Sequence, residues 1–138
     1  KIVSSNSEVR RLVARGEVKV GITDTDDANV AVREGSAVKI VYPDQSGMGT
    51  LIMPNMVCLI KNSTNQENGK KLIDYLVSSE VEKSLAFAMC AQMPLRHYVG
   101  TPADVLTIAA IKGMDINYHD VAMKLDKIGE FLKQWAGY

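Results

Sequence analysis

A β-type run followed directly by a polar cluster decides the fold of this chain: Val18-Lys19-Val20-Gly21-Ile22-Thr23-Asp24-Thr25-Asp26-Asp27. Its first half is rich in β-branched residues, which favour extended backbone. Its second half holds Thr and Asp, which are preferred at the start of a helix. The sequence therefore predicts a strand over residues 18–22 that leads into a helix over residues 27–34, with Gly35 just beyond its end.

The flanking segments repeat this order of strand and helix. Ser5 and Glu8 have capping-box spacing, so we expect a helix over residues 8–14 that Gly16 ends. A second β-type run covers residues 38–42, and an extended apolar segment covers residues 50–60, interrupted by Pro54. This order predicts an α/β fold with a mostly parallel sheet flanked by helices. Ligands of such sheets bind beyond the carboxyl ends of the strands.

The second half of the chain reads as helical. Amphipathic or helix-like runs predict helices over residues 65–77 and 80–90. Thr101 is a typical N-cap residue, and Pro102 follows it where proline is favoured, at the first position of a helix. This pair predicts a helix over residues 102–112. Asn117 is expected to cap a last helix that runs to about residue 135. The apolar stripe of this helix consists of Val121, Leu125, Ile128 and Leu132.

Composition narrows the function classes. The 138 residues carry 16 basic and 16 acidic side chains, and this balance argues against a nucleic-acid partner. No apolar run approaches the ~20 residues that span a bilayer. Cys58 and Cys90 are far apart in apolar runs, so we expect buried free thiols rather than a metal site. The length predicts one domain, and the start at Lys1 suggests a processed or excised chain.

The acidic cluster is the first candidate site. Asp24, Asp26 and Asp27 place three carboxylates within four residues, and such close charges repel unless a cation or a donor offsets them. Helix capping explains one or two of them. The cluster can also bind a polar solute or a hard cation through Thr and Asp oxygens. An enzyme remains the alternative, because Asp24-Thr25-Asp26 after a strand is similar to the motif of magnesium-dependent phosphotransferases and phosphatases.

The second candidate site is the loop over residues 44–50. Gly47 and Gly49 flank Met48, and glycines let the backbone approach a ligand closely. A solvent-exposed turn is the simpler interpretation of this loop. As a cleft edge, it would present Ser46, Gly47 and Met48.

Several blocks in succession carry a family resemblance: residues 15–28, 41–45, 49–51, 54–55, 71–82 and 88–96. Together they resemble the C-terminal portion of type II periplasmic solute-binding proteins of ABC importers, in the branch that includes ferric-iron-binding proteins. The resemblance implies two α/β lobes that close on a solute. It implies that residues 1–45 and 97–138 belong to the second lobe. Residues 46–96 would then supply a crossing strand and helices of the first lobe.

The resemblance further implies a protein without catalytic activity that delivers its ligand to a membrane permease. Its location would be the periplasm, or the outer face of the membrane of a Gram-positive cell. The ligand would be a small solute, ferric iron or an iron chelate. Where ferric-binding members carry two tyrosines, this chain holds Thr25, Asp26 and Asp27, so Asp26 and Asp27 are the candidate metal ligands. We expect one of these two to face the cleft while the other caps the helix, with Thr23 and Asp24 beside them. Apolar surface left by a missing lobe would favour a homodimer.

Overall fold

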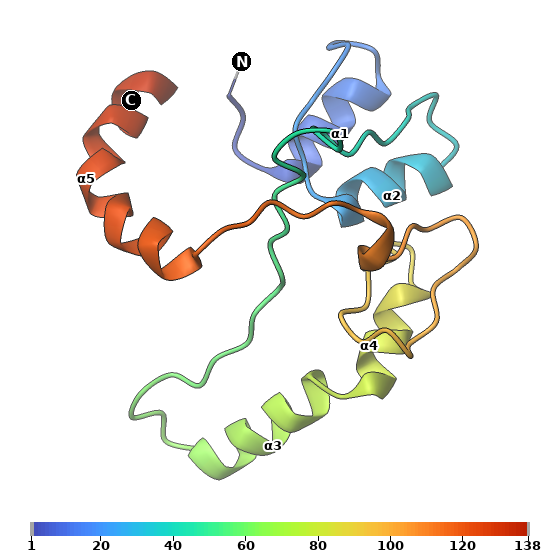
Figure 1. Ribbon diagram of the computed structural model, residues 1–138. Coiled ribbons are helices and arrows are strands. Elements are labelled where there is room, and N and C mark those ends of the chain that lie inside the picture. The colour runs from blue at the N-terminus through green and yellow to red at the C-terminus, as the bar shows by residue number, and fades with distance from the viewer. Residues whose placement is uncertain (1, 138) are drawn as a thin grey trace.

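The predicted acidic cluster lies at the start of the second of two short helices (Figure 1). The computed structural model describes residues 2–137, and its first two helices, α1 (Asn6–Ala14) and α2 (Thr25–Arg33), pack against each other. The Ser5 side chain accepts a hydrogen bond from the backbone N–H of Glu8, which confirms this half of the capping box. Gly16 and Gly35 follow the two helices at φ +72° and +79°, as expected for residues that end helices.

The other helices are spread along an open chain path. They are α3 (Gln66–Leu76), α4 (Ser79–Ala86), the short 3-10 helix η1 (Ile108–Ala110) and α5 (Tyr118–Ala136). The helices predicted over residues 65–77 and from Asn117 onward are confirmed, and the Asn117 side chain accepts from the N–H groups of His119 and Asp120. Figure 1 shows α3 at the bottom and α5 at the left of the molecule, away from α1 and α2. Among residues 2–137, no helix combines the length and the apolar character that crossing a membrane needs.

The α-helix predicted over residues 102–112 is wrong. Only the one turn of η1 forms there, and Ile111 is already extended at φ −117° and ψ 125°. Thr50 and Gly113 form a parallel β-bridge, in which the N–H of Thr50 donates to the carbonyl of Lys112. This pairing with a distant segment needs extended backbone, and it outweighs the local signal of Thr101 and Pro102.

The other predicted strands have no partners in the part of the chain described. Apart from that bridge, residues 2–137 hold no β-ladder, and residues 18–22, 38–42 and 51–60 run without one. The extended segment of residues 51–60, here called the strap, joins the Thr50 bridge to the turn before α3 (Figure 1). The mostly parallel sheet stays a prediction.

A small core joins α2 to the segment after α4. Its buried apolar side chains are Leu12, Ala31, Ala86, Ala91, Val105 and Ile111. Asn29 is the buried polar residue, and its Nδ2 donates to the carbonyls of Cys90 at 3.3 Å and Ala91 at 3.2 Å. Arg33 also donates to the carbonyl of Ala88. These bonds fix α2 on residues 88–91, so the acidic cluster sits on a supported helix.

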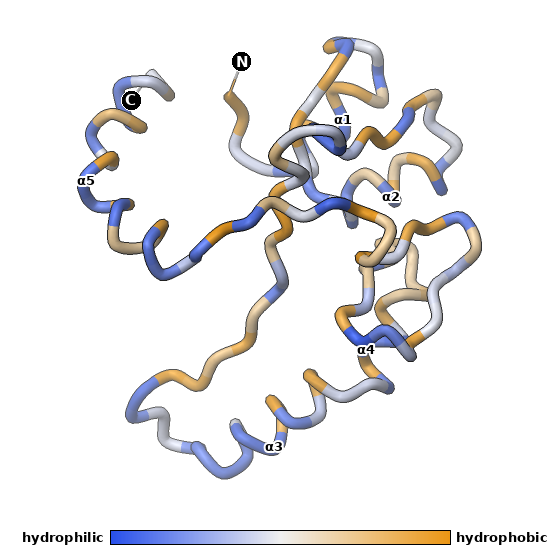
Figure 2. The backbone as a smooth tube through the Cα atoms, in the orientation of Figure 1, coloured by the Kyte–Doolittle hydropathy of each residue, from blue (hydrophilic) through white to orange (hydrophobic). Residues whose placement is uncertain are grey.

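Apolar side chains remain exposed outside this core. The Val20, Ile22 and Met56 side chains are 81, 95 and 87% exposed. Figure 2 shows hydrophobic stretches along the strap and on α5. Cys58 and Cys90 are both free, but Cys58 is exposed, so its predicted burial is wrong. The reason is local, because Cys58 lies on the strap and the strap has no covering layer.

A charged clamp holds the loop after Pro94 to α4. Glu82 accepts from the N–H groups of Leu95 at 2.5 Å and Arg96 at 3.1 Å, and it pairs with the Arg96 guanidinium at 2.7 Å. Arg96 also donates to the carbonyl of Val77 at 2.7 Å. Burial pushes the pKa of Glu82 up, but these hydrogen bonds and the Arg96 charge outweigh it and hold the pKa below its ordinary 4.5.

The lowered Glu82 pKa gives a pH prediction. A carboxyl whose pKa is lower in the folded than in the unfolded state stabilises the fold. This stabilisation is complete at pH values above the unfolded-state pKa, and it is lost as the pH falls through the folded-state pKa. We expect Glu82→Gln to lower the urea unfolding midpoint at pH 7, and the difference from the unmodified chain to shrink as the pH falls below about 4. Glu80→Gln, on the same helix, is the control. If the difference between the two urea midpoints did not change with pH, the stabilising role of the Glu82 carboxylate would be contradicted.

Candidate functional site

The first turn of α2 is built around Asp24. Asp24 has extended backbone at φ −84° and ψ 170°, and its side chain accepts from the N–H of Asp27 at 3.3 Å. Asn6 donates to the other Asp24 oxygen from the start of α1. The expectation that Asp26 or Asp27 caps the helix is therefore wrong. Asp24 lies one residue before the helix, where a carboxylate reaches the free N–H groups of the first turn.

Asp27 is paired with α1. Its carboxylate accepts from the Ser7 hydroxyl at 3.2 Å and lies 3.1 Å from Nε of Arg10, with both charged side chains less than one-fifth exposed. Arg10 also bonds Glu34 at 2.8 Å. The sequence analysis missed these α1 residues. Their signal is the helical spacing of Ser7 and Arg10, which places a hydroxyl and a cation on one face of α1.

The remaining members of the cluster lie around Asp26. The hydroxyl of Thr23 donates to the carbonyl of Asn6 at 3.3 Å, and Thr25 is the first residue of α2. Asp26 is half-buried. Desolvation raises the pKa of Asp26 above its ordinary 3.8, and the hydrogen bond and the charge of Asp24 raise it further. A cationic group placed beside Asp26 would lower the pKa of Asp26 again, because an opposite charge stabilises the ionised carboxylate.

The second candidate segment is a tight loop docked on residues 111–114. Asp44 starts it in the left-handed region at φ 54°, and its carboxylate accepts from the N–H of Met48 at 2.7 Å. The Gln45 amide bonds both the N–H and the carbonyl of Lys112, at 2.8 and 3.2 Å. The loop leaves Ser46, Gly47 and Met48 exposed. Exposure agrees with both the turn and the cleft-edge interpretations.

The two candidate segments are separate in this structure. Among residues 2–137, no hydrogen bond or ion pair joins residues 23–27 to residues 44–50. In the same part of the chain, no group of three or more His, Cys, Asp or Glu side chains is arranged to hold a metal ion. The ligand role of both segments and the metal role of Asp26 and Asp27 therefore stay predictions.

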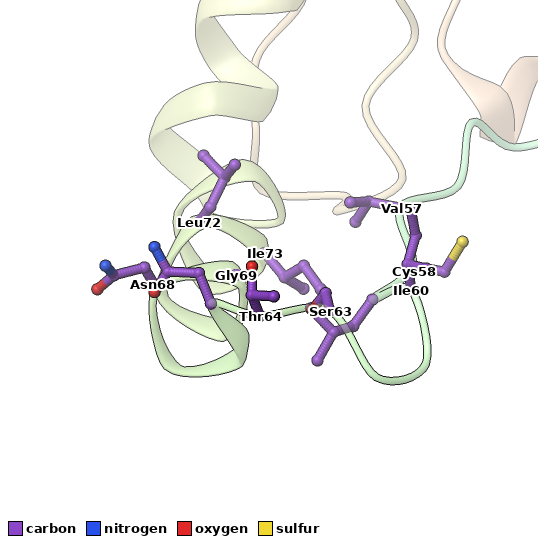
Figure 3. Close-up of a pocket in the computed structure, with 11 residues that line it drawn as sticks. Val57, Cys58, Ile60, Ser63, Thr64, Asn68, Gly69, Leu72 and Ile73 are labelled. Atoms are coloured by element: carbon purple, nitrogen blue, oxygen red, sulfur yellow. The ribbon is translucent and has the colours of Figure 1, made fainter.

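A hollow lies elsewhere, between the strap and α3 (Figure 3). Val57 and Ile60 line it from the strap, and Leu72 and Ile73 line it from α3. The Cys58 sulfur points away from α3 in this view. The hollow lacks charged side chains, and its polar lining residues are Ser63, Thr64, Asn65 and Asn68. It therefore offers hydroxyl and amide groups but none of the carboxylates of the candidate site.

Comparison with curated proteins gives one consistent result. Over 130 residues the chain is 31% identical to proteins of Salmonella typhimurium, Salmonella paratyphi A and Salmonella typhi that are named as 2-aminoethylphosphonate-binding periplasmic proteins. The match covers 88% of this chain and 38% of each relative, so the chain spans well under half of the relatives' length. No family model matches the chain. No solved structure matches it. Over the matched residues, the chain is thus similar to periplasmic binding proteins.

Proposed function

We propose that this chain is part of a non-enzymatic substrate-binding component of an ABC importer, which captures a small solute outside the cytoplasmic membrane and delivers it to a membrane permease. The observation that carries the proposal is the 31% identity over 130 residues to periplasmic binding proteins. The periplasm is the proposed location for the same reason. The division into residues 1–45 and 97–138 as one lobe and residues 46–96 as part of another belongs to this proposal.

The proposed solute is a small molecule that carries an ammonium and a phosphonate group. Support comes from the names of the relatives and from the acidic cluster. An ammonium group donates up to three hydrogen bonds, and Asp26 is a half-buried carboxylate whose ionisation is disfavoured beside Asp24. Thr23 and Thr25 add hydroxyls at the same end of α2. Ser46, Gly47 and Met48 are proposed as the opposite edge, where the exposed Ser46 hydroxyl would donate to the anion.

Ferric iron or an iron chelate is a weaker candidate for the solute. It depends on Asp26 and Asp27 as ligands, and Asp27 is already paired with Arg10. The names of the relatives also indicate a phosphonate rather than iron.

A ligand panel tests the proposal. We expect 2-aminoethylphosphonate to raise the melting temperature, while ethylphosphonate, which lacks the ammonium group, raises it much less. Stabilisation by ferric citrate alone would favour iron. Magnesium-dependent turnover of p-nitrophenyl phosphate that Asp24→Asn abolishes would instead favour the phosphotransferase and overturn the proposal. The panel is run on the 138-residue chain and on the Salmonella typhimurium relative, which serves as the binding control.

Asp26→Asn separates binding from stability. Loss of a charge-assisted hydrogen bond costs about 1.5–3 kcal/mol, so we expect the affinity for 2-aminoethylphosphonate to fall roughly 10- to 100-fold in calorimetry. The unliganded variant should melt at a higher temperature at pH 7, since a carboxyl with a raised pKa destabilises the fold once the pH exceeds that pKa. Asp74→Asn on α3 is the matched control. Lower stability together with unchanged affinity would contradict the role of Asp26.

A further inference from the structure

The hollow between the strap and α3 is built on a close contact between the two segments. Gly69 lies inside α3, where glycine is less favourable than alanine. A Cβ at Gly69 would lie 2.6 Å from Cδ1 of Leu59 on the strap, so this approach requires glycine. Both residues line the hollow, whose volume of about 430 Å³ is within the usual range of small-molecule sites (Figure 3).

One wall of the hollow is apolar. Val57 and Ile60 line it from the strap, and Leu72 and Ile73 line it from α3. Ile60 and Leu72 are 76 and 56% exposed, so water covers this wall. Replacing that water with hydrocarbon is favourable. The wall therefore favours a ligand that carries an apolar chain.

The polar end of the hollow contains a hydroxyl without a partner. Ser63 lines the hollow, and its Oγ is buried with no hydrogen-bond partner among residues 2–137. Buried polar groups in folded proteins are normally hydrogen-bonded, so this exception needs an explanation. Rotation about the Cα–Cβ bond brings the hydroxyl to other staggered positions, from which it can donate to an acceptor in the hollow.

The first turn of α3 adds backbone donors at the same end. Asn65 lines the hollow and precedes the helix, but its side chain forms no capping hydrogen bond. The N–H groups of residues 66–68 donate to no described residue, as expected for the uncapped start of a helix. Glu67 is the acidic residue of this turn, and it pairs with Lys70 at 3.0 Å outside the hollow. An anion at this end would meet free donors and the positive end of the helix dipole.

We infer that the hollow between the strap and α3 binds an apolar monocarboxylate. Its carboxylate accepts from the Ser63 hydroxyl and from the first turn of α3, and its hydrocarbon chain lies against Val57, Ile60 and Leu72. A neutral apolar molecule would not use the charge preference of the helix start, and a cation would have the wrong sign. The site is separate from the acidic cluster, and it goes beyond the proposed function.

A set of three probes of equal chain length tests the inference on the 138-residue chain. Octanoate is the anionic probe, and 1-octanol and octylammonium are its neutral and cationic counterparts. We expect octanoate to shift the NMR amide signals of residues 66–68 and to bind at least about 10-fold more tightly than either counterpart in calorimetry. Equal affinity of the three probes would reduce the hollow to an apolar surface and overturn the inference. No binding of octanoate would also overturn it.

Ser63→Ala separates ligand binding from folding. The affinity for octanoate should fall about 10-fold or more, because a hydrogen bond to a charged group is lost. The urea unfolding midpoint of the unliganded variant should not fall, because the change removes a buried hydroxyl that has no partner. Ser84→Ala, at an exposed position of α4, is the matched control and should leave the affinity unchanged. Equal octanoate affinity of the two variants would contradict the role of Ser63.

Leu72→Gln tests the apolar wall. The affinity for octanoate should fall about 5-fold or more, whereas Leu76→Gln, on the same helix but outside the hollow, should change it little. Equal losses in both variants would contradict the placement of the chain.

Asp26→Asn distinguishes this site from that of the proposed solute, because it should leave octanoate binding unchanged. Displacement of octanoate by 2-aminoethylphosphonate would make the hollow part of the solute site and overturn the inference. A chain that binds octanoate but not 2-aminoethylphosphonate would leave the inference standing and remove the proposed solute.

Discussion

Asn29→Asp is expected to lower the free energy of unfolding by about 3–5 kcal/mol at pH 7. Asn29 is 7% exposed, and its amide donates to the carbonyls of Cys90 and Ala91. An ionised carboxylate at this position cannot donate, and it would face two carbonyl oxygens without a compensating cation. Since small domains are stable by only about 5–15 kcal/mol, this loss would unfold a large fraction of the molecules.

Urea unfolding measures this effect, and pH identifies its cause. Protonation restores a donor to the Asp side chain, so the deficit of Asn29→Asp should become smaller at acid pH. Asn68→Asp, at an exposed position of α3, is the control and should change the free energy by less than about 0.5 kcal/mol. If Asn29→Asp behaved like Asn68→Asp, α2 would not be held on residues 88–91 as described.

Gly49→Ala is expected to cost about 3 kcal/mol and to release the loop over residues 44–50. Gly49 has φ +97°, and a Cβ there would lie 2.7 Å from the carbonyl oxygen of Lys112 and 2.8 Å from the carbonyl carbon of Gly113. The backbone cannot keep this conformation with a side chain, so the Thr50–Gly113 bridge should open.

Amide exchange at Thr50 and Met114, whose N–H groups bond across the bridge, reports its opening directly. Gly100→Ala is the matched control, because a Cβ at Gly100 has no atom within 4 Å and its φ is not positive. Slow exchange at both amides in Gly49→Ala would show that the loop tolerates a side chain.

The capping signals at Ser5 and Asn117 were reliable. Ser5 caps α1 and Asn117 caps α5 as predicted, because these contacts lie within four residues. The helix over residues 102–112 was wrong because Lys112 bonds Gln45, which is 67 positions away in the chain. Strand pairing is similarly non-local. A β-type run such as residues 18–22 indicates a preference for extended backbone, but the sequence does not name its partner.

The candidate site shows the same limit. The sequence located the cluster at the start of a helix, but it assigned the cap to Asp26 or Asp27 rather than to Asp24. The ion pair between Asp27 and Arg10 depends on how α1 packs on α2, which no local pattern contains. Residue type therefore located the acidic cluster, whereas the bonding partner of each carboxylate depends on the tertiary structure.

Arg10 contacts α2 at both ends, at Asp27 in its first turn and at Glu34 after its last. These points lie seven residues apart, or about 10 Å along the helix axis. Both contacts end on the one Arg10 guanidinium, so they form a single attachment point on α1. The Ser7 hydroxyl, about one helical turn away, donates to the same Asp27 carboxylate and supplies a second point. Together the two points oppose swivelling of α1 about the Arg10 contact.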